Sequence, residues 1–324
     1  MPTFDPQVEA LLELGRKAGA RPFELLTPEQ ARAAYAASWD ILQPKAVDVA
    51  SVTDRTITGK GGELRLRVYR GIGTQADELL PCMVFLHGGG WVIGNLESHD
   101  RLCRRLANKA RICVVAVDYR LAPEHRFPAA LDDSASALQW VADKVRELRL
   151  APGRIAIGGD SAGGNLAAVL ALMGRDGTAP ATMYQLLIYP VLDLGASSAS
   201  YRRVTSGVSL TAATMHYFIA HYTPQASARL DWRASPQRAA SLAGTPPALV
   251  VTVANDPLCD EGRAYAQRLE DDGVRVTALH LSDHQHGMLM HGKLIQASNL
   301  INDFVGAMVG DALHRGSPAP VKAA

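Results

Sequence analysis

The spacing of apolar residues changes near residue 60. Between Val8 and Leu14 they recur at helical intervals, which predicts helices in the first fifty residues. Thr27-Pro28-Glu29-Gln30 supports this, because it places an N-cap threonine, a first-turn proline and a capping-box glutamine in the right order. Residues 64–70 then alternate strictly between apolar and polar side chains, as a half-buried antiparallel strand does.

Short runs of consecutive apolar residues follow, separated by helical patterns. The runs occupy residues 83–86, 112–117, 155–157, 186–188 and 249–251, with a last strand expected at Val274–Leu279. Wholly apolar strands that alternate with helices are typical of a parallel sheet covered on both faces. The pattern therefore predicts an α/β fold with a mostly parallel central sheet flanked by helices.

One segment interrupts this alternation. Residues 197–238 contain no evident buried strand, although Met215–Ile219 is apolar and aromatic. We interpret the segment as a helical insertion above the carboxyl edge of the sheet, where ligands usually bind. The alternative is a peripheral helix without a role in binding. The predicted parts are N-terminal cap helices at 1–50, a catalytic domain at 51–196 and 239–316, a helical cap at 197–238, and a disordered tail at 317–324.

Composition narrows the function classes. Of the 324 residues, 48% are hydrophobic, which is enough for a large core, and the formal net charge of +1 indicates neither a nucleic-acid nor an anionic membrane partner. We expect no membrane span, because no apolar window approaches about eighteen residues. The N-terminus lacks signal-peptide features, and the four cysteines are scattered. We predict a cytoplasmic protein with reduced thiols, and neither a metal site nor a cofactor.

The strongest chemical signal is Gly158-Gly159-Asp160-Ser161-Ala162-Gly163-Gly164-Asn165. It follows the apolar run 155–157 and precedes the helix-forming stretch 166–172. A serine between two such glycines on a strand-to-helix turn is the G-x-S-x-G nucleophile elbow, which presents the hydroxyl next to a helix N-terminus. The pentapeptide alone is common, and an ordinary glycine-rich connection is the alternative. Partner residues elsewhere have to decide between the two.

Two residues after later strands provide those partners. Asp256 follows the strand at 249–253, and His286 follows the strand that ends near Leu281. The order serine, aspartate, histidine is that of the α/β-hydrolase triad. In this interpretation His286 takes the Ser161 proton during attack on a carbonyl carbon, and Asp256 orients the imidazole.

Rival residues lie near both partners. His284 and His291 flank His286, which we prefer because Gly287 lets its loop pack beside the nucleophile. Other acidic residues near strand ends are Asp118, Asp160, Asp193, Asp260 and Asp283. We interpret Asp118-Tyr119-Arg120 as part of a structural ion pair, Asp160 as a hydrogen-bonding residue that tethers a loop, and Asp260 as an N-terminal carboxylate of the next helix.

His87-Gly88-Gly89-Gly90-Trp91 follows the strand at 83–86. Consecutive glycines allow backbone N–H groups to turn toward a developing oxyanion. We predict Gly88, Gly89 and Ala162 as the donors. A simple glycine turn or a phosphate-binding loop is the alternative, but the phosphate motif is incomplete because no Lys-Ser/Thr follows.

Four motifs together resemble the hormone-sensitive-lipase-like carboxylesterases, also called bacterial family IV esterases, of the α/β-hydrolase fold. They are His87-Gly88-Gly89-Gly90-Trp91, Tyr119-Arg120-Leu121-Ala122-Pro123-Glu124-His125, Gly159-Asp160-Ser161-Ala162-Gly163-Gly164-Asn165 and Asp256-Pro257-Leu258-Cys259-Asp260-Glu261-Gly262. The resemblance, which runs from about Pro81 to the C-terminal helix, implies a sheet of about eight strands. The family's triad falls on Ser161, Asp256 and His286, and its oxyanion donors fall on Gly88, Gly89 and Ala162. The chain departs from the family at Cys259, usually arginine, and at Met288, usually phenylalanine.

The resemblance implies a serine carboxylesterase, active on short- to medium-chain acyl esters and connected with lipid metabolism. We expect the acyl or alcohol pocket to be lined by Trp91, Tyr217, Phe218 and Met288. It also implies a homodimer formed through the edge strand near 274–279, with a small-molecule ester as the other partner. The alternatives are an amide, carbamate or lactone hydrolase with the same machinery, and a non-catalytic small-molecule receptor on the same fold.

Overall fold

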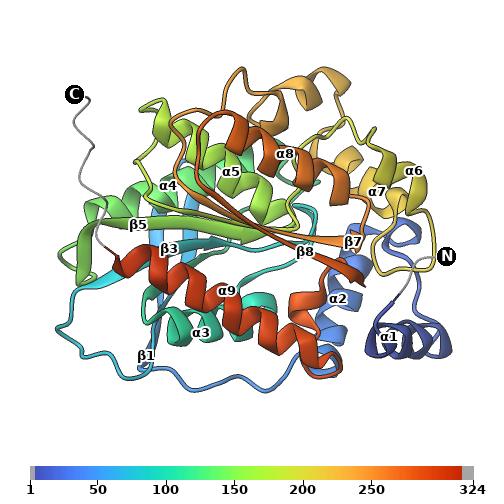
Figure 1. The fold of residues 1–324 in the computed structure, drawn as a ribbon, viewed down its shortest axis with the longest axis horizontal. Helices are drawn as coiled ribbons and strands as arrows, with labels where there is room; N and C mark the ends of the chain where they lie inside the picture. The colour runs from blue at the N-terminus through green and yellow to red at the C-terminus, as the bar shows by residue number, and fades with distance from the viewer. Residues whose placement is uncertain (1–3, 316–324) are drawn as a thin grey trace.

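A single eight-stranded sheet forms the centre of the computed structural model, which describes residues 4–315 (Figure 1). The strand order is β1-β2-β4-β3-β5-β6-β7-β8. The strands are β1 (Ser51–Gly59), β2 (Gly62–Arg70), β3 (Leu80–Leu86), β4 (Cys113–Val117), β5 (Leu150–Asp160), β6 (Gln185–Ile188), β7 (Ala248–Asn255) and β8 (Val276–Gln285). The strand β2 pairs antiparallel with β1 and with β4, and all other neighbours are parallel. The predicted α/β-hydrolase architecture is confirmed.

Helices cover both faces of this sheet. The helices α3 (Leu96–Ala110) and α9 (Gln296–His314) lie side by side on one face, and α4 (Ala129–Asp143), α5 (Ala162–Arg175) and α8 (Cys259–Asp271) cover the other (Figure 1). Strands β3 and β4 are buried along their whole length, which explains why they have no polar alternation. The helix α5 is buried from Ala162 to Leu172, so it packs in the centre of the molecule.

Two strands differ from the sequence pattern. The first, β1, was not predicted, because Ile57 is its only buried residue and its alternation therefore carries no apolar signal. The last strand was expected at 274–279 but spans Val276–Gln285, because Gly273, with φ +79°, still belongs to the turn after α8. The longer β8 ends directly before His286.

Further helices come from the N-terminal segment and from the segments that follow β6 and β8. From the N-terminal segment come α1 (Pro6–Lys17), η1 (Phe23–Leu25) and α2 (Pro28–Leu42), and the predicted capping box at Thr27 is confirmed. The later segments are α6 (Ala199–Arg203), α7 (Ala212–Tyr222), η2 (Ala226–Leu230), η3 (Pro236–Arg238) and η4 (Met288–Met290). The two groups meet where Thr214 Oγ1 donates to Glu24 Oε2 at 2.6 Å. The predicted tail at 317–324 lies outside the described residues.

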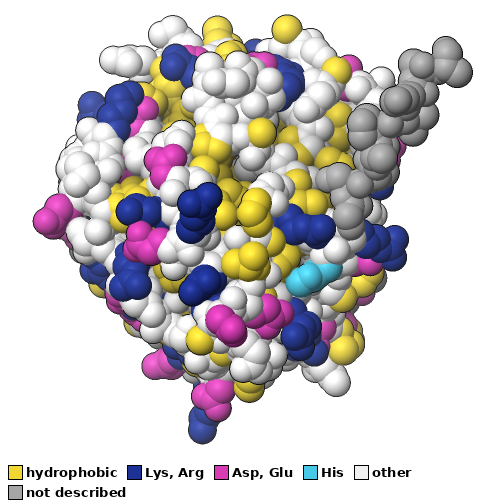
Figure 2. All heavy atoms as spheres, turned by 90° about the vertical axis from the view of Figure 1, so that its left-hand side faces the viewer, with side chains coloured by type: hydrophobic (Ala, Val, Ile, Leu, Met, Phe, Trp, Pro, Cys, Tyr) yellow, Lys and Arg dark blue, Asp and Glu magenta, His cyan; other side chains and the backbone are white. Residues whose placement is uncertain are grey.

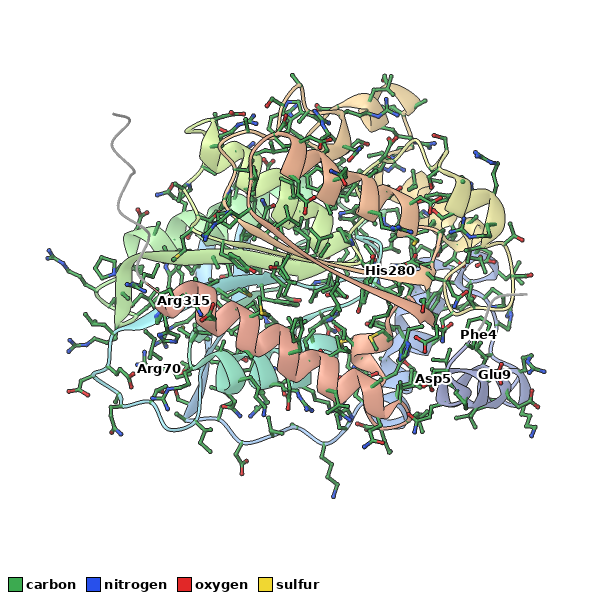
Figure 3. The ribbon with its side chains drawn as sticks, in the orientation of Figure 1. Phe4, Asp5, Glu9, Arg70, His280 and Arg315 are labelled. Carbon is green, nitrogen blue, oxygen red and sulfur yellow. The ribbon has the colours of Figure 1, made fainter. Side chains whose placement is uncertain are left out.

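Both groups of segments also bond the end of β8. The N–H of Asp5, labelled in Figure 3, donates to Asp283 O at 3.0 Å. The N–H of Ser209 donates to the buried side chain of Gln285 at 2.8 Å. Both bonds lie within three residues of His286, so these segments are connected to the chain directly before that residue.

The left-hand side of the molecule in Figure 1 faces the viewer in Figure 2. Its surface carries basic and acidic side chains interspersed with apolar ones. Within residues 4–315, no helix is long and apolar enough to cross a membrane. No group of three or more His, Cys, Asp or Glu side chains in that same range is arranged to hold a metal ion.

Candidate active site

Ser161 occupies the turn between β5 and α5 with a left-handed backbone, at φ +54° and ψ −117°. A non-glycine residue adopts this conformation only when its surroundings enforce it. Here the serine N–H donates to Ile188 O at 2.8 Å, and its carbonyl accepts from Val191 at 3.2 Å. Gly159 and Gly163 lie so close to the backbone of the neighbouring strand β3 that a Cβ on either would overlap it. The sequence therefore forms a true elbow.

Three distant segments converge on this serine. His286 Nε2 lies 3.0 Å from Ser161 Oγ, and His286 Nδ1 lies 2.6 Å from Asp256 Oδ2. Asp256 has no exposed surface, and its other oxygen accepts from the Leu258 N–H at 2.8 Å. Because a carboxylate only accepts, Nδ1 carries the ring hydrogen and Nε2 is free to accept one from the serine. The ring of Tyr189 packs against the imidazole, with centroids 4.5 Å apart.

The rival histidines point elsewhere. His284 Nδ1 lies 2.6 Å from Asp283 Oδ1. His291 is buried, and burial together with the nearby His286 lowers its pKa to about 4. Neither has a hydrogen bond to Ser161 among the described residues. The structure thus brings His286, and neither His284 nor His291, within hydrogen-bond distance of Ser161.

The rival carboxylates have structural contacts. Asp260 lies in the first turn of α8, which confirms its expected place at a helix N-terminus. Arg120 pairs with Asp133 at 2.8 Å, while Asp118 lies 3.8 Å from Arg65. The ion pair expected for the segment 118–120 is therefore present, although its two charged residues have separate partners.

The glycine loop at 87–91 corrects one expected role. The N–H of Gly88, predicted to be an oxyanion donor, instead donates to Asp160 Oδ1 at 2.9 Å, with His99 Nε2 as a longer contact at 3.3 Å. A hydrogen held by a carboxylate is not available to an oxyanion. Asp160 is therefore the loop-tethering residue that the sequence suggested. The next two residues, Gly89 and Gly90, have φ of +115° and +58°, which only glycine adopts readily.

The predicted pocket residues fall into two groups. Trp91 and Met288 have no exposed surface; the Trp91 ring stacks on Tyr222 with centroids 4.3 Å apart. Phe218 lies against Gly90, where a Cβ would overlap its ring, and Tyr217 contacts Phe218 edge-on at 5.4 Å. The structure thus brings Phe218 to the glycine loop and places Trp91 and Met288 in the packed interior.

Arg32, on α2, binds the loop after the glycine motif, and the sequence did not predict this contact. Its guanidinium donates to Val92 O at 2.8 Å and Ala122 O at 2.9 Å, and it pairs with Glu124, at 2.7 Å. This hydrogen bonding lowers the pKa of Glu124 to about 2. An arginine in an amphipathic helix gives no signal of such a contact. The one feature that could have indicated it is Glu124, an acidic residue of the motif at 119–125 for which no basic partner was predicted.

Comparison with known proteins agrees with this geometry. The family model described as alpha/beta hydrolase fold matches residues 83–290. The chain belongs to this family. Over 305 residues it is 37% identical to an ethyl acetate hydrolase from Pseudomonas putida, covering 92% of this chain and 95% of that one. It is 38% identical to the carboxylic ester hydrolase LipN of Mycobacterium tuberculosis, covering 89% and 77% of the two chains.

Solved structures give the same result. A thermostable esterase from Pseudomonas putida ECU1011 superposes with a TM-score of 0.91 at 36% identity, covering 98% of this chain and 99% of that one. A hyperthermophilic esterase from Pyrobaculum calidifontis superposes with a TM-score of 0.88 at 39% identity, covering 96% and 99%. The resemblance to hormone-sensitive-lipase-like esterases is confirmed, and the protein is a carboxylic ester hydrolase.

Proposed function

We propose that the protein is a serine carboxylesterase that hydrolyses short- to medium-chain acyl esters through an acyl-enzyme intermediate. The observation that carries the proposal is the continuous hydrogen-bonded chain from Asp256 through His286 to Ser161, at 2.6 and 3.0 Å. A hydroxyl, an imidazole and a buried carboxylate in this order are the parts of a nucleophilic acyl-transfer site.

The reaction follows from the proton positions. His286 Nε2 accepts the Ser161 proton while Oγ bonds to the ester carbonyl carbon, and the carbonyl electrons move onto oxygen. Collapse of that tetrahedral species expels the alcohol, which takes the proton from His286 and leaves the acyl group on Ser161. Water repeats the sequence, with His286 as its base, and releases the acid. Asp256 stabilises the imidazolium formed in each half.

Backbone N–H groups stabilise the charge that develops on the carbonyl oxygen. We assign this role to Ala162, at the N-terminus of α5, and to Gly89 and Gly90. Gly90 takes the place first predicted for Gly88, whose N–H is held by Asp160. Donors of this kind are worth about 10²–10³ in rate each.

The cap supports a preference for small acyl groups. Ser161 is 6% exposed, and Phe218 of α7 covers the glycine loop, so the reacting atoms lie in an enclosed site. Among the relatives, one is named for ethyl acetate and another, from Saccharolobus solfataricus, is an arylesterase. The first name describes an ester whose acid and alcohol parts are both small.

A panel of p-nitrophenyl esters from two to twelve acyl carbons tests the proposal. We expect kcat/KM to be highest between about two and eight carbons, because longer chains need more enclosed apolar surface. A matched butyryl anilide separates ester from amide hydrolysis, and we expect the ester to react far faster because an alcohol is a better leaving group than an amine. A phosphonate ester that fails to label Ser161 in the parent protein would exclude a working triad and favour a receptor.

Assembly and location are part of the same proposal. We propose a homodimer that pairs through the edge strand β8, and a cytoplasmic location with a role in lipid metabolism. Support for the dimer comes from the position of β8 at one end of the strand order, where one row of backbone groups has no neighbouring strand in the sheet. Support for the location is the scattered, buried cysteines.

A further inference from the structure

Behind the glycine loop lies a buried pair of titratable side chains that the mechanism above does not use. His99, on α3, is 1% exposed, and Asp160, the last residue of β5, is 5% exposed. We propose that His99 and Asp160 are positioning residues that hold the Gly88 peptide so that the following N–H groups face the substrate oxygen. The inference rests on the proposed function, because it concerns how the oxyanion donors are kept in place.

The contacts converge on one carboxylate oxygen. Asp160 Oδ1 accepts the Gly88 N–H at 2.9 Å and lies 3.0 Å from His99 Nε2. Because that oxygen only accepts, Nε2 of His99 carries a hydrogen and donates it. Gly88 has no room for a side chain, since a Cβ would overlap the Asp160 carboxylate. The close approach thus requires glycine on one side and the carboxylate on the other.

Ionisation of Asp160 strengthens both of the hydrogen bonds that its Oδ1 accepts. Burial opposes ionisation, but the imidazoles of His99 and His87 hold the pKa of Asp160 below its ordinary value. His99 is itself fixed, with Nδ1 2.8 Å from the Ser98 hydroxyl in the first turn of α3. The orientation of the carboxylate is therefore set by a helix, which is more rigid than the loop that it anchors.

The other side of the loop is held independently. The ring of His87 stacks on Tyr119 with centroids 4.1 Å apart, and Tyr119 donates to the His87 carbonyl at 2.6 Å. His87 Nδ1 also lies 2.8 Å from Gly88 O, and the Gly89 carbonyl accepts the N–H groups of Val92 and Ile93 at 3.0 and 2.9 Å. The bond from the Gly88 N–H to Asp160 adds the remaining restraint, on the N–H side of the residue directly before Gly89 and Gly90. Its loss would misalign the donors and raise the barrier more than it weakens substrate binding.

A purely structural role makes a different prediction. A buried pair of titratable groups often adds little net stability, so stability alone does not explain its position against the loop. Removing a structural pair would lower the melting temperature without a selective effect on the transition state. Removing a positioning pair lowers kcat and the affinity for tetrahedral mimics together, while KM changes little.

Three variants and one control separate these cases. His99→Leu removes the donor, His99→Gln keeps an amide N–H near the position of Nε2, and Asp160→Asn keeps the shape but removes the charge. The control is Asp100→Asn, the next residue on α3, whose carboxylate accepts from Arg104 at 2.6 Å and from the Tyr69 hydroxyl at 3.0 Å, and has no hydrogen bond to residues 87–91 within the described part of the chain. Each full-length variant is assayed for kcat and KM on p-nitrophenyl butyrate and for inhibition by an alkyl boronic acid, which forms a tetrahedral adduct with serine.

We expect His99→Leu and Asp160→Asn to lose about 10²-fold in kcat and to bind the boronic acid more weakly by a similar factor, with KM within a few-fold of the parent. His99→Gln should recover most of both losses, and Asp100→Asn should resemble the parent. Melting curves verify that each variant is folded at the assay temperature. If His99→Leu does not fold, the comparison of kcat between Asp160→Asn and His99→Gln tests the inference in its place.

Folded His99→Leu and Asp160→Asn proteins with parental kcat and boronic acid affinity would overturn the inference. Equal losses in Asp100→Asn would also overturn it, because they would indicate general loosening of α3. A parent that neither hydrolyses the ester nor reacts with a phosphonate would instead contradict the proposed function itself.

Discussion

The backbone at Ser161 decides how its side chain reacts. A positive φ at a serine costs free energy, and it is maintained by bonds to Ile188 and Val191 on neighbouring segments. The hydroxyl is thereby presented to His286 without any movement of the chain. Reactivity at this residue depends on its fixed geometry more than on its chemical type. Among the described residues, the only other serine hydroxyl bonded to a histidine is that of Ser98, next to His99.

Replacing the nucleophile gives the first prediction. Ser161→Ala should reduce kcat on p-nitrophenyl butyrate by about 10⁶-fold, because the three triad residues act as a unit. The fold should be retained, since a methyl side chain accepts the same backbone. Ser136→Ala is the control: among the described residues its hydroxyl bonds Asp132 O and the Lys60 N–H and no triad residue, so its activity should match the parent. A Ser161→Ala rate close to the parent's would mean that another group attacks the ester.

Two buried histidines predict how stability depends on pH. Burial lowers the pKa of His87 to about 3 and, together with His286, the pKa of His291 to about 4. In the unfolded chain an imidazole titrates near 6.5, so between these values the unfolded state binds more protons than the folded one. The free energy of unfolding therefore falls as the pH is lowered from about 7 to 4, by about 3 kcal/mol for a single such histidine.

Thermal unfolding at intervals from pH 7.5 to 4 measures this. His291→Leu removes one of the two groups, so its melting temperature should fall less steeply over the acid range than that of the parent. His280→Leu is a suitable comparison, because His280 is exposed on the edge strand β8 (Figure 3). Parallel curves for His291→Leu and the parent would contradict the assignment of His291 as a neutral buried imidazole.

The elbow between β5 and α5 has no room for a side chain at its glycines. A Cβ at Gly163 would overlap the backbone of Leu86 and His87, which cannot move without displacing β3. Gly163→Ala should therefore lose nearly all activity and several degrees of melting temperature. Gly15→Ala provides the matched control: it is in the exposed helix α1 with no atom near the new methyl, so it should raise stability by about 0.5–1 kcal/mol. Equal effects of the two variants would refute the close approach.

The helices and strands differ in how well the sequence alone predicts them. The parallel strands and the capped helix at Thr27 could be predicted, because burial on both faces and capping leave local signatures. The strand β1 could not, since a mostly exposed strand has no apolar period. In the site, the triad order was readable. The engagement of Gly88 by Asp160 was not, because which N–H a carboxylate accepts depends on contacts between segments 72 residues apart.

For the whole molecule, the two ends of the sheet differ in how they are protected. The edge strand β1 carries Asp54 and Arg55, and Arg67 of β2 pairs with Asp54 at 2.6 Å. Charges of this kind oppose pairing with a second sheet. Along β8 the exposed residues Ala278, His280 and Ser282 carry no acidic or strongly basic side chain, and the charged Asp283, whose side chain is 46% exposed, lies near the carboxyl end of the strand and bonds His284. The edge at β8 is therefore the better candidate for contact between two copies.

This difference predicts the effect of a single charge. In a two-fold pairing each residue near the axis approaches its own copy, so Ala278→Lys places two ammonium groups close together across the interface. We expect the parent to elute with the mass of a dimer in size-exclusion chromatography with light scattering, and Ala278→Lys to shift toward the monomer, less so at high salt. Ala181→Lys, an exposed alanine outside the sheet, should leave the mass unchanged. A monomeric parent, or an Ala278→Lys dimer as stable as the parent's, would show that copies of the chain do not pair through β8.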